Sequence, residues 1–332
     1  MMRDNIITAN NINIAALVKA LLAEEVVALP SETVYGLAAD ATSNAAVKKI
    51  YNIKNRPSYN PLIIHVCDIA MVREYCIVSE FAYYLMHYFW PGALTLVLPL
   101  KAKHQLAAAV TAGLTTVAVR SPKGLFNKII KDFGKPLAAP SANKSGGISP
   151  TNAMAVAQDI GDKLDLIVDG GACEIGIEST IVKLDGNVLR ILRHGGITKE
   201  ALVAALKAFN ATSGLDPIIL GLSGNSATIE APGMLSSHYA PRSLMRLGIT
   251  EIKTGEVLLA FGQQQCAHVE RALKILNLSK SGNLKEAALN LYYYLKCLDA
   301  CNPTAIAVQN IPQYDLGVAI NDRLARAAAP RI

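Results

Sequence analysis

Apolar residues in the first 209 positions alternate between helical and strand-like spacing. Between residues 14 and 22 they recur every three or four positions, which predicts an amphipathic helix, and the run VVALP that follows predicts a short buried strand. Ser43 stands where the N-cap of a second helix is expected, and that helix must end before Pro57. Further β-rich runs are LIIHV, LTLVL, TTVAV, PLAA and LDLIV. One α/β domain, residues 1–209, accounts for this alternation.

The rest of the chain changes character twice. Asp185-Gly186 predicts a hairpin between STIVKL and VLRILR at the end of the first domain. Residues 210–245 are rich in Gly, Ser, Pro and Asn with little periodicity, which predicts a linker. Beyond it, the runs EVLLAFG and TAIAVQ predict strands, and 284–298 and GVAINDRLARAAA predict helices. We therefore expect a small C-terminal α/β domain over residues 246–332.

Composition limits the class of protein. Of 332 residues, 52% are hydrophobic and 17% are charged, which is typical of a folded chain with more than one core. The longest apolar runs fall far short of the roughly 18 residues that span a bilayer. The first ten residues lack a secretory apolar region, so we expect a cytoplasmic protein without a membrane partner. The six cysteines form no Cys-x-x-Cys pair or zinc spacing, so we expect no metal site built from protein ligands.

The net charge of +6 is unevenly distributed along the chain. Residues 44–67 contain four cations and no carboxylate, a composition that suits an anionic ligand, a nucleic acid or merely a solvated basic face. Two of these cations, Lys54 and Arg56, lie just before Pro57, and a residue before proline favours extended backbone. In an extended segment they would share one face, with Asn55 opposite, and would form an anion clamp.

Other segments place polar side chains where α/β proteins bind ligands. The loop PSANKSGGISPT, residues 140–151, combines hydroxyls, an amide and two glycines, so its N–H groups could surround phosphate oxygens. Glu32 and Thr33 follow one predicted strand, and Glu178 and Ser179 precede another. A turn or capping role fits each of these segments as well. The chain contains neither a Walker loop nor a dinucleotide fingerprint.

Three further residues have two interpretations each. His65 lies within an apolar run, a pattern that favours a hydrogen-bonded core histidine over a ligand contact. Arg120 and Arg193 each end a predicted strand, where ion pairing is a common role.

Together these segments resemble the YrdC-like family. PSETVYGLAADA, IKNRPSYNPLIIHV, FWPGALTLVL, TVAVRSP, PLAAPSANKSGG, GIESTIV and ILRHGGI occur in the order found in that family. The tail APGMLSSHYAPRS, followed by a small α/β domain, resembles the two-domain members of this family, the L-threonylcarbamoyladenylate synthases. The resemblance is weaker beyond Leu244. The resemblance implies a twisted mixed α/β sheet with an open, positively charged cavity and a smaller Rossmann-like C-terminal domain.

The resemblance also implies an activity and its residues. L-threonine, bicarbonate and ATP would give threonylcarbamoyl-AMP and pyrophosphate, a nucleotidyltransferase reaction that serves threonylcarbamoyladenosine modification of tRNA. Mg²⁺ would be bound mainly through the ATP phosphates, and direct contact with tRNA or tRNA-modification proteins is left open. By motif, catalysis falls to Lys54 and Arg56. ATP binding falls to these two and to Asn60, Thr115, Ser141, Asn143, Ser149 and Arg193. Threonine binding falls to Thr33, His65, Val119, Arg120 and Ser179, and a lid to His238 and Tyr239.

The implied chemistry suits these residue types. Carbamate, triphosphate and pyrophosphate are anions, so the reaction needs cations and N–H donors more than a strong base. Ser31 stands where the family more often has threonine, and residues 235–237 are less basic than usual. One alternative is an RNA-binding module without catalysis, although no aromatic RNA-binding signature is visible. Another is the related carbamoyl transferase of hydrogenase maturation, whose zinc-finger Cys-x-x-Cys pairs this chain lacks.

Overall fold

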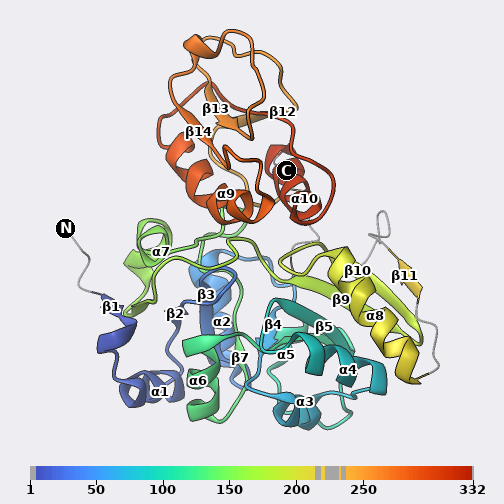
Figure 1. Cartoon of the computed structure of the whole chain (residues 1–332). Helices are drawn as coiled ribbons and strands as arrows, with labels where there is room; N and C mark the ends of the chain where they lie inside the picture. The colour runs from blue at the N-terminus through green and yellow to red at the C-terminus, as the bar shows by residue number, and fades with distance from the viewer. Residues whose placement is uncertain (1–4, 214–217, 221–231, 233–236, 331–332) are drawn as a thin grey trace.

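Two α/β units, one large and one small, make up the computed structural model, which describes residues 5–213, 218–220, 232 and 237–330 (Figure 1). In those residues, eleven strands form one sheet in the order β1-β8-β2-β3-β7-β4-β6-β5-β9-β10-β11. The strands are β1 (Ile6–Thr8), β2 (Val27–Leu29), β3 (Gly36–Asp40), β4 (Ile63–His65), β5 (Leu94–Pro99), β6 (Thr116–Arg120), β7 (Leu137–Ala138), β8 (Ile167–Asp169), β9 (Thr180–Asp185), β10 (Val188–Arg193) and β11 (Ile218–Leu220). Parallel and antiparallel pairs both occur, so the predicted mixed sheet is confirmed.

Helices connect these strands. They are α1 (Ile14–Leu22), α2 (Asn44–Lys54), α3 (Ile69–Tyr75), α4 (Glu80–Phe89), α5 (Ala108–Thr111), α6 (Gly124–Phe133), α7 (Ala153–Ile160) and α8 (Lys199–Ser213). The predicted cap of α2 is confirmed, because the Ser43 side chain accepts a hydrogen bond from the Ala46 N–H. The helix ends at Asn55, whose left-handed backbone (φ 51°) turns the chain before Pro57.

The central strands of the large sheet have two different faces. Along β6, Val117 and Val119 belong to the main core, which the helices cover, whereas Ala118 belongs to a small cluster on the opposite face. Ile63 of β4 joins Ala118 in that cluster. Because side chains alternate along a strand, Arg120 lies on the same face as Ala118. The less covered face of the sheet is therefore where polar residues at strand ends can meet.

The predicted domain boundary at residue 209 is too early. Helix α8 continues to Ser213, and β11 pairs in parallel with β10, which extends the first sheet to Leu220. Asn, Thr and Ser end this helix, and these residues favour turns and caps over helix interiors, so the sequence pattern indicates a linker. Phe209 anchors the helix by stacking on Phe81 at 5.2 Å. The rest of the predicted linker up to residue 236 lies outside the described residues, apart from residue 232.

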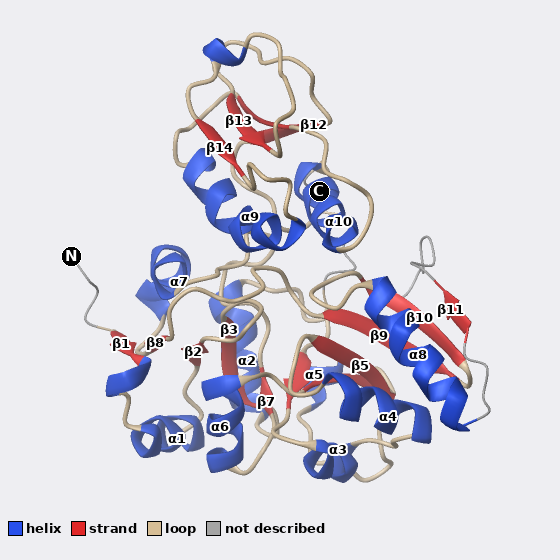
Figure 2. Ribbon diagram, viewed as in Figure 1, coloured by secondary structure: helices blue, strands red, loops and turns tan. Residues whose placement is uncertain are grey.

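The C-terminal unit is a four-stranded parallel sheet with helices packed on it, so the predicted small α/β domain is confirmed (Figure 2). Within the described residues its sheet order is β12-β15-β13-β14. Its elements are β12 (Leu244–Leu247), β13 (Val257–Ala260), β14 (Ile275–Asn277), β15 (Ala305–Val308), α9 (Leu284–Asp299) and α10 (Leu316–Ala328). Helices α9 and α10 lie between this sheet and the large unit (Figure 1).

An apolar contact joins the two units. Val34, Ile148 and Ile177 of the large unit share one buried cluster with residues of α9 and α10. Gly176 approaches α9 so closely that an added Cβ would lie 2.4 Å from the Cα of Leu289, and its φ is +81°. Glycine is therefore required at this contact. The second unit consequently packs against the loops that carry the predicted ligand residues.

Candidate active site

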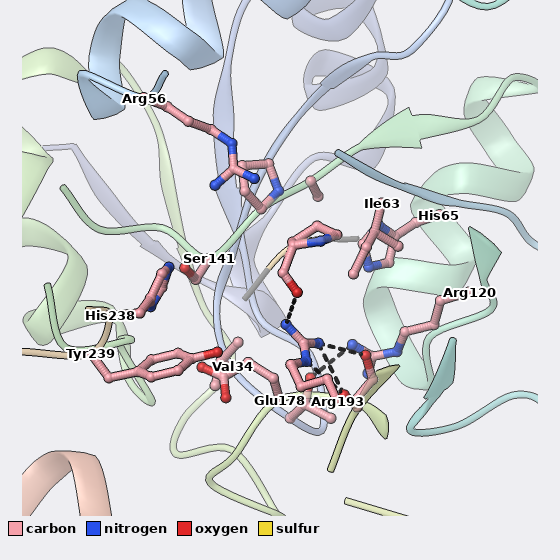
Figure 3. A pocket seen from close by; sticks show the side chains of 15 residues that line it. Val34, Arg56, Ile63, His65, Arg120, Ser141, Glu178, Arg193, His238 and Tyr239 are labelled. Atoms are coloured by element: carbon pink, nitrogen blue, oxygen red, sulfur yellow. Dashed lines mark hydrogen bonds between the residues drawn. The ribbon is translucent and has the colours of Figure 1, made fainter. Parts of the chain in front are cut away.

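Residues from widely separated parts of the sequence line one pocket on the less covered face of the large sheet (Figure 3). Nine of the fifteen predicted site residues are among them: Thr33, Arg56, His65, Arg120, Ser141, Ser179, Arg193, His238 and Tyr239. Strand pairing explains part of this convergence, because β4 and β6 are parallel with His65 opposite Arg120. A bridge between Gly36 and Ser141 brings the 140–151 loop beside β3.

Arg120 is held rigidly at one side of the pocket. Its Nη2 lies 2.7 Å from Glu32 Oε1 in a buried ion pair, and its Nη1 donates to Thr33 Oγ1 at 2.8 Å. Burial alone would raise the pKa of Glu32, but Arg120 outweighs it and lowers that pKa. Ser31 hydrogen-bonds with Thr33 Oγ1 at 2.9 Å, so serine keeps the hydroxyl contact at this position. The guanidinium and the Thr33 hydroxyl therefore have fixed positions in the pocket.

Lys54 and Arg56 do not share a face of an extended segment, so that prediction is wrong. Lys54 is the last residue of α2, and the left-handed Asn55 turns the backbone between them. Lys54 Nζ donates to the carbonyl oxygens of Ser141 and Asn143, each at 2.5 Å. Burial, and next Arg56, hold the pKa of Lys54 well below its usual value. Lys54 therefore shapes the 140–151 loop and does not itself line the pocket.

Arg56 reaches the pocket while anchored to its own loop. Its Nη2 donates to Asn60 Oδ1 at 2.6 Å and to Pro61 O at 2.8 Å, and its Nε donates to Asn60 O at 3.2 Å. Among the described residues, these hydrogen bonds are donated by Nε and Nη2. The acceptors of the Arg56 hydrogen bonds are carbonyl and amide oxygens and not carboxylates, which agrees with the absence of Asp and Glu from residues 44–67. Asn60 therefore orients Arg56 and does not line the pocket.

Four more predicted residues lie behind the pocket or away from it. The Ser149 hydroxyl donates to Glu178 Oε1 at 2.6 Å, and Asn143 accepts from Lys54, so both support residues around the pocket. The side chain of Val119 belongs to the opposite face of β6 from Arg120, because the two are neighbours on the strand, and Thr115 immediately precedes β6. Val119 is buried in the main core and Thr115 is exposed. Neither residue lines the pocket, and their roles in ligand binding stay predictions.

Two histidines lie in the pocket wall. His65 stacks on Phe126 with ring centroids 5.0 Å apart, and His238 lies against Tyr239. Burial lowers the pKa of both histidines to about 3, so both rings are neutral near pH 7. His238 Nδ1 and the Tyr239 hydroxyl have no hydrogen-bond partner among the described residues. Both groups are therefore available to a ligand.

The segment after the linker reaches back to the pocket. The Ala240 N–H donates to Gly146 O at 2.8 Å, and residues 147 and 240 form a parallel bridge. This pairing fixes His238 and Tyr239 beside the 140–151 loop, and Figure 3 shows them across the view from His65 and Arg120. The backbone N–H of His238 also donates to Arg326 O of α10. The predicted lid residues thus connect the pocket with the C-terminal unit.

Sequence reasoning missed the contribution of the C-terminal unit. Glu178 accepts hydrogen bonds from the Tyr292 hydroxyl of α9 and, at 2.8 Å, from Arg323 Nε of α10. Burial would raise the pKa of Glu178, but Arg323, Arg193 and Ser149 together lower it to about 2. No sequence pattern could have paired Glu178 with Arg323, because 145 positions separate them.

No group of three or more His, Cys, Asp or Glu side chains in the described part of the chain is arranged to hold a metal ion. No helix within that part has the length and apolar character needed to cross a membrane.

The fold and the pocket define a two-unit α/β protein with a cation-lined site of the YrdC-like type. The family model described as "Telomere recombination", for Sua5, YciO and YrdC proteins, matches residues 19–195. A second model, described as "Threonylcarbamoyl-AMP synthase, C-terminal domain", matches residues 197–329. The chain therefore belongs to the Sua5/YciO/YrdC family, which confirms the resemblance found in its motifs.

Relatives match the chain over nearly its whole length. A protein of Bacillus subtilis named threonylcarbamoyl-AMP synthase is 38% identical, with 98% of this chain and 96% of that protein covered. A Pyrococcus abyssi protein of the same name is 35% identical, with 93% and 92% covered. The crystal structure of P. abyssi Sua5 complexed with L-threonine superposes with a TM-score of 0.83 at 32% identity, covering 97% of each chain.

Proposed function

We propose that the protein is a threonylcarbamoyl-AMP synthase, an enzyme that makes threonylcarbamoyl-AMP and pyrophosphate from L-threonine, bicarbonate and ATP. The observation that carries this proposal is the match, over 97% of both chains, to a structure complexed with L-threonine. The pocket supports it, since Arg56, Arg120 and Arg193 all line it. Three arginines suit a reaction in which every reacting group apart from the amine carries negative charge.

Threonine would bind on the side of the pocket formed by β2, β4 and β6. Arg120 has a fixed guanidinium for the threonine carboxylate, and Thr33 presents a hydroxyl held by Ser31 and Arg120. The neutral ring of His65 would accept or donate a hydrogen bond without repelling the threonine amine. Ser179, whose hydroxyl is paired with Thr95 at 2.7 Å, lies between this side and Arg193.

The nucleotide would bind between Arg56 and the 140–151 loop. Arg56 would contact phosphate through Nη1, and Ser141 would contribute its hydroxyl. Lys54 Nζ would hold this loop in position through the carbonyl oxygens of Ser141 and Asn143. Arg193 donates to the carbonyl and hydroxyl oxygens of Ser179 at 2.9 and 3.2 Å. A phosphate oxygen would be a stronger acceptor than either of these neutral groups.

Two bond-forming steps would take place in this pocket. The threonine amine attacks bicarbonate and water leaves, which gives a carbamate; a carbamate oxygen then attacks the α-phosphate while pyrophosphate departs in line. Arg56 and Arg193 would spread the charge that develops on the phosphate oxygens. Mg²⁺ would enter as part of the ATP complex, because this ion commonly binds through substrate phosphates and both nearby carboxylates are engaged by arginines. His238 and Tyr239 would close the pocket and shield the carbamate from water.

The proposal extends to class, compartment and partners. Transfer of the AMP group to the carbamate makes the enzyme a nucleotidyltransferase. We place it in the cytoplasm, in the pathway of threonylcarbamoyladenosine formation on tRNA. Direct contact with tRNA or with tRNA-modification proteins would then fall to surfaces outside the pocket.

Pyrophosphate release from ATP tests the proposal. We expect release that requires both L-threonine and bicarbonate, together with a product that has the mass of threonylcarbamoyl-AMP. L-serine in place of threonine measures specificity. A folded protein that releases no pyrophosphate under any of these conditions would contradict the proposal, and salt-dependent RNA binding without turnover would favour the binding module instead.

A further inference from the structure

Glu178 presents an electrostatic problem within the pocket. It is the only acid among the described residues that line the pocket, and its side chain is 7% exposed. Arg193 lies close enough to interact with it. A buried negative charge would repel ATP and carbamate, and it would also attract the arginine that these ligands need. A compensating group is therefore necessary for an anion to bind.

The compensation comes from the C-terminal unit. Arg323, whose side chain is 0% exposed, donates from Nε to Glu178 Oε2 at 2.8 Å. The Tyr292 hydroxyl lies 2.9 and 3.0 Å from the two carboxylate oxygens. The Arg323 guanidinium also lies 5.0 Å from the centre of the Tyr239 ring, which stacks on Tyr292 at 5.9 Å. Arg323 thus contacts two residues that line the pocket, Glu178 and Tyr239.

We propose that Arg323 is a positioning residue for nucleotide binding: it pairs with Glu178 so that Arg193 stays directed to the anionic substrate. The inference deepens the proposed function and rests on it. Without Arg323, Glu178 would be a far stronger acceptor for Arg193 than the neutral oxygens of Ser179. The C-terminal unit would then serve to keep the pocket electropositive.

Substitution of both partners separates this role from simple packing. Arg323→Met removes the compensating charge, and we expect the KM for ATP to rise by about tenfold or more with a smaller change in kcat. Adding Glu178→Gln removes the charge that needs compensation, so the double variant should recover a KM within about threefold of wild type. Arg271→Met, an exposed arginine of the same unit, is the matched control and should leave KM unchanged.

Two outcomes would overturn the inference. One is an unchanged KM in folded Arg323→Met, and the other is a double variant no better than Arg323→Met, because neutralising Glu178 does not refill the space that the Arg323 side chain occupied. If Arg323→Met fails to fold, ATP binding is compared between the double variant, Arg323→Met with Glu178→Gln, and the single variant Glu178→Gln. Folded protein that binds ATP is expected for both, and a folded double variant that binds no ATP would refute the role.

Direct binding keeps this test separate from the proposed function. Calorimetry with ATP–Mg²⁺ and with inorganic pyrophosphate gives dissociation constants without turnover. If wild type binds both ligands but makes no threonine-dependent product, the synthase proposal fails while the dissociation constants of the variants still decide the role of Arg323. If wild type binds neither ligand, both proposals fail.

Discussion

Arg56→Ala tests whether a buried cation in the pocket serves the ligand more than the fold. The substitution removes donors from Asn60 Oδ1 and Pro61 O, whereas Asn60 O keeps the Tyr51 hydroxyl at 2.9 Å. Two lost hydrogen bonds correspond to about 2–3 kcal/mol of unfolding free energy. Part of this is offset, because burial disfavours the cation and lowers the pKa of Arg56 to about 10. We therefore expect a net destabilisation of about 1–2 kcal/mol.

The effect of Arg56→Ala on catalysis should be larger. Loss of one donor to transition-state charge typically costs about 10²–10³ in rate, or about 3–4 kcal/mol. Urea unfolding and kcat/KM for ATP, measured on the same preparation, compare the two quantities directly. Arg190→Ala, a half-buried strand arginine outside the pocket that pairs with Asp185, is the control and should keep kcat/KM within about twofold. A folded Arg56→Ala variant with kcat/KM within threefold of wild type would refute the assigned role.

Three further predictions concern pH, packing and metal. His65 has a folded pKa of about 3 against an ordinary value of 6.5, so the stability linked to it is complete above pH 6.5 and is lost as the pH falls toward 3. At pH 5 this loss of unfolding free energy is about 2 kcal/mol. Between pH 7.5 and pH 5, the melting temperature of His65→Phe should therefore fall less than that of His87→Gln, an exposed control that keeps His65. Equal falls in the two variants would contradict the assignment. Gly195→Ala should abolish pyrophosphate release and lower the melting temperature, because the Cβ of the new alanine would lie 2.3 Å from the backbone oxygen of Glu178. An active variant with an unchanged melting temperature would show that this backbone can shift. Excess EDTA should stop pyrophosphate release, with recovery on adding Mg²⁺, and EDTA-resistant turnover would exclude the proposed ATP–Mg²⁺ substrate.

Local features of the fold could be predicted where short-range forces decide them. The spacing of apolar residues predicted α1, and the Ser43 hydroxyl predicted the start of α2. Asp185-Gly186 predicted the antiparallel pair β9 and β10. Backbone geometry at Lys54 and Arg56 was predicted wrongly, since the proline rule fixes only the residue before Pro57 and left-handed Asn55 lies one position earlier.

The pocket illustrates a different limit. Motif order gave the residue types, but strand alternation decided which side chains reach the ligand, so Arg120 lines the pocket and Val119 lies in the core. Alternation along β6 puts Ala118 on the same face as Arg120 and Val119 on the opposite face. That signal was present in the sequence and could have been used.

The sequence by itself determined the elements that local patterns specify, the family and the residue types of the pocket, because periodicity, caps and contiguous motifs are properties of neighbouring residues. Only the tertiary structure decided which charges are paired. Glu32 pairs with Arg120 across 88 positions and Glu178 with Arg323 across 145, and both pairs form because strand order and domain packing bury them together. The partner that the fold places beside a buried charge decides how far that charge is stabilised, and no local sequence pattern specifies that partner.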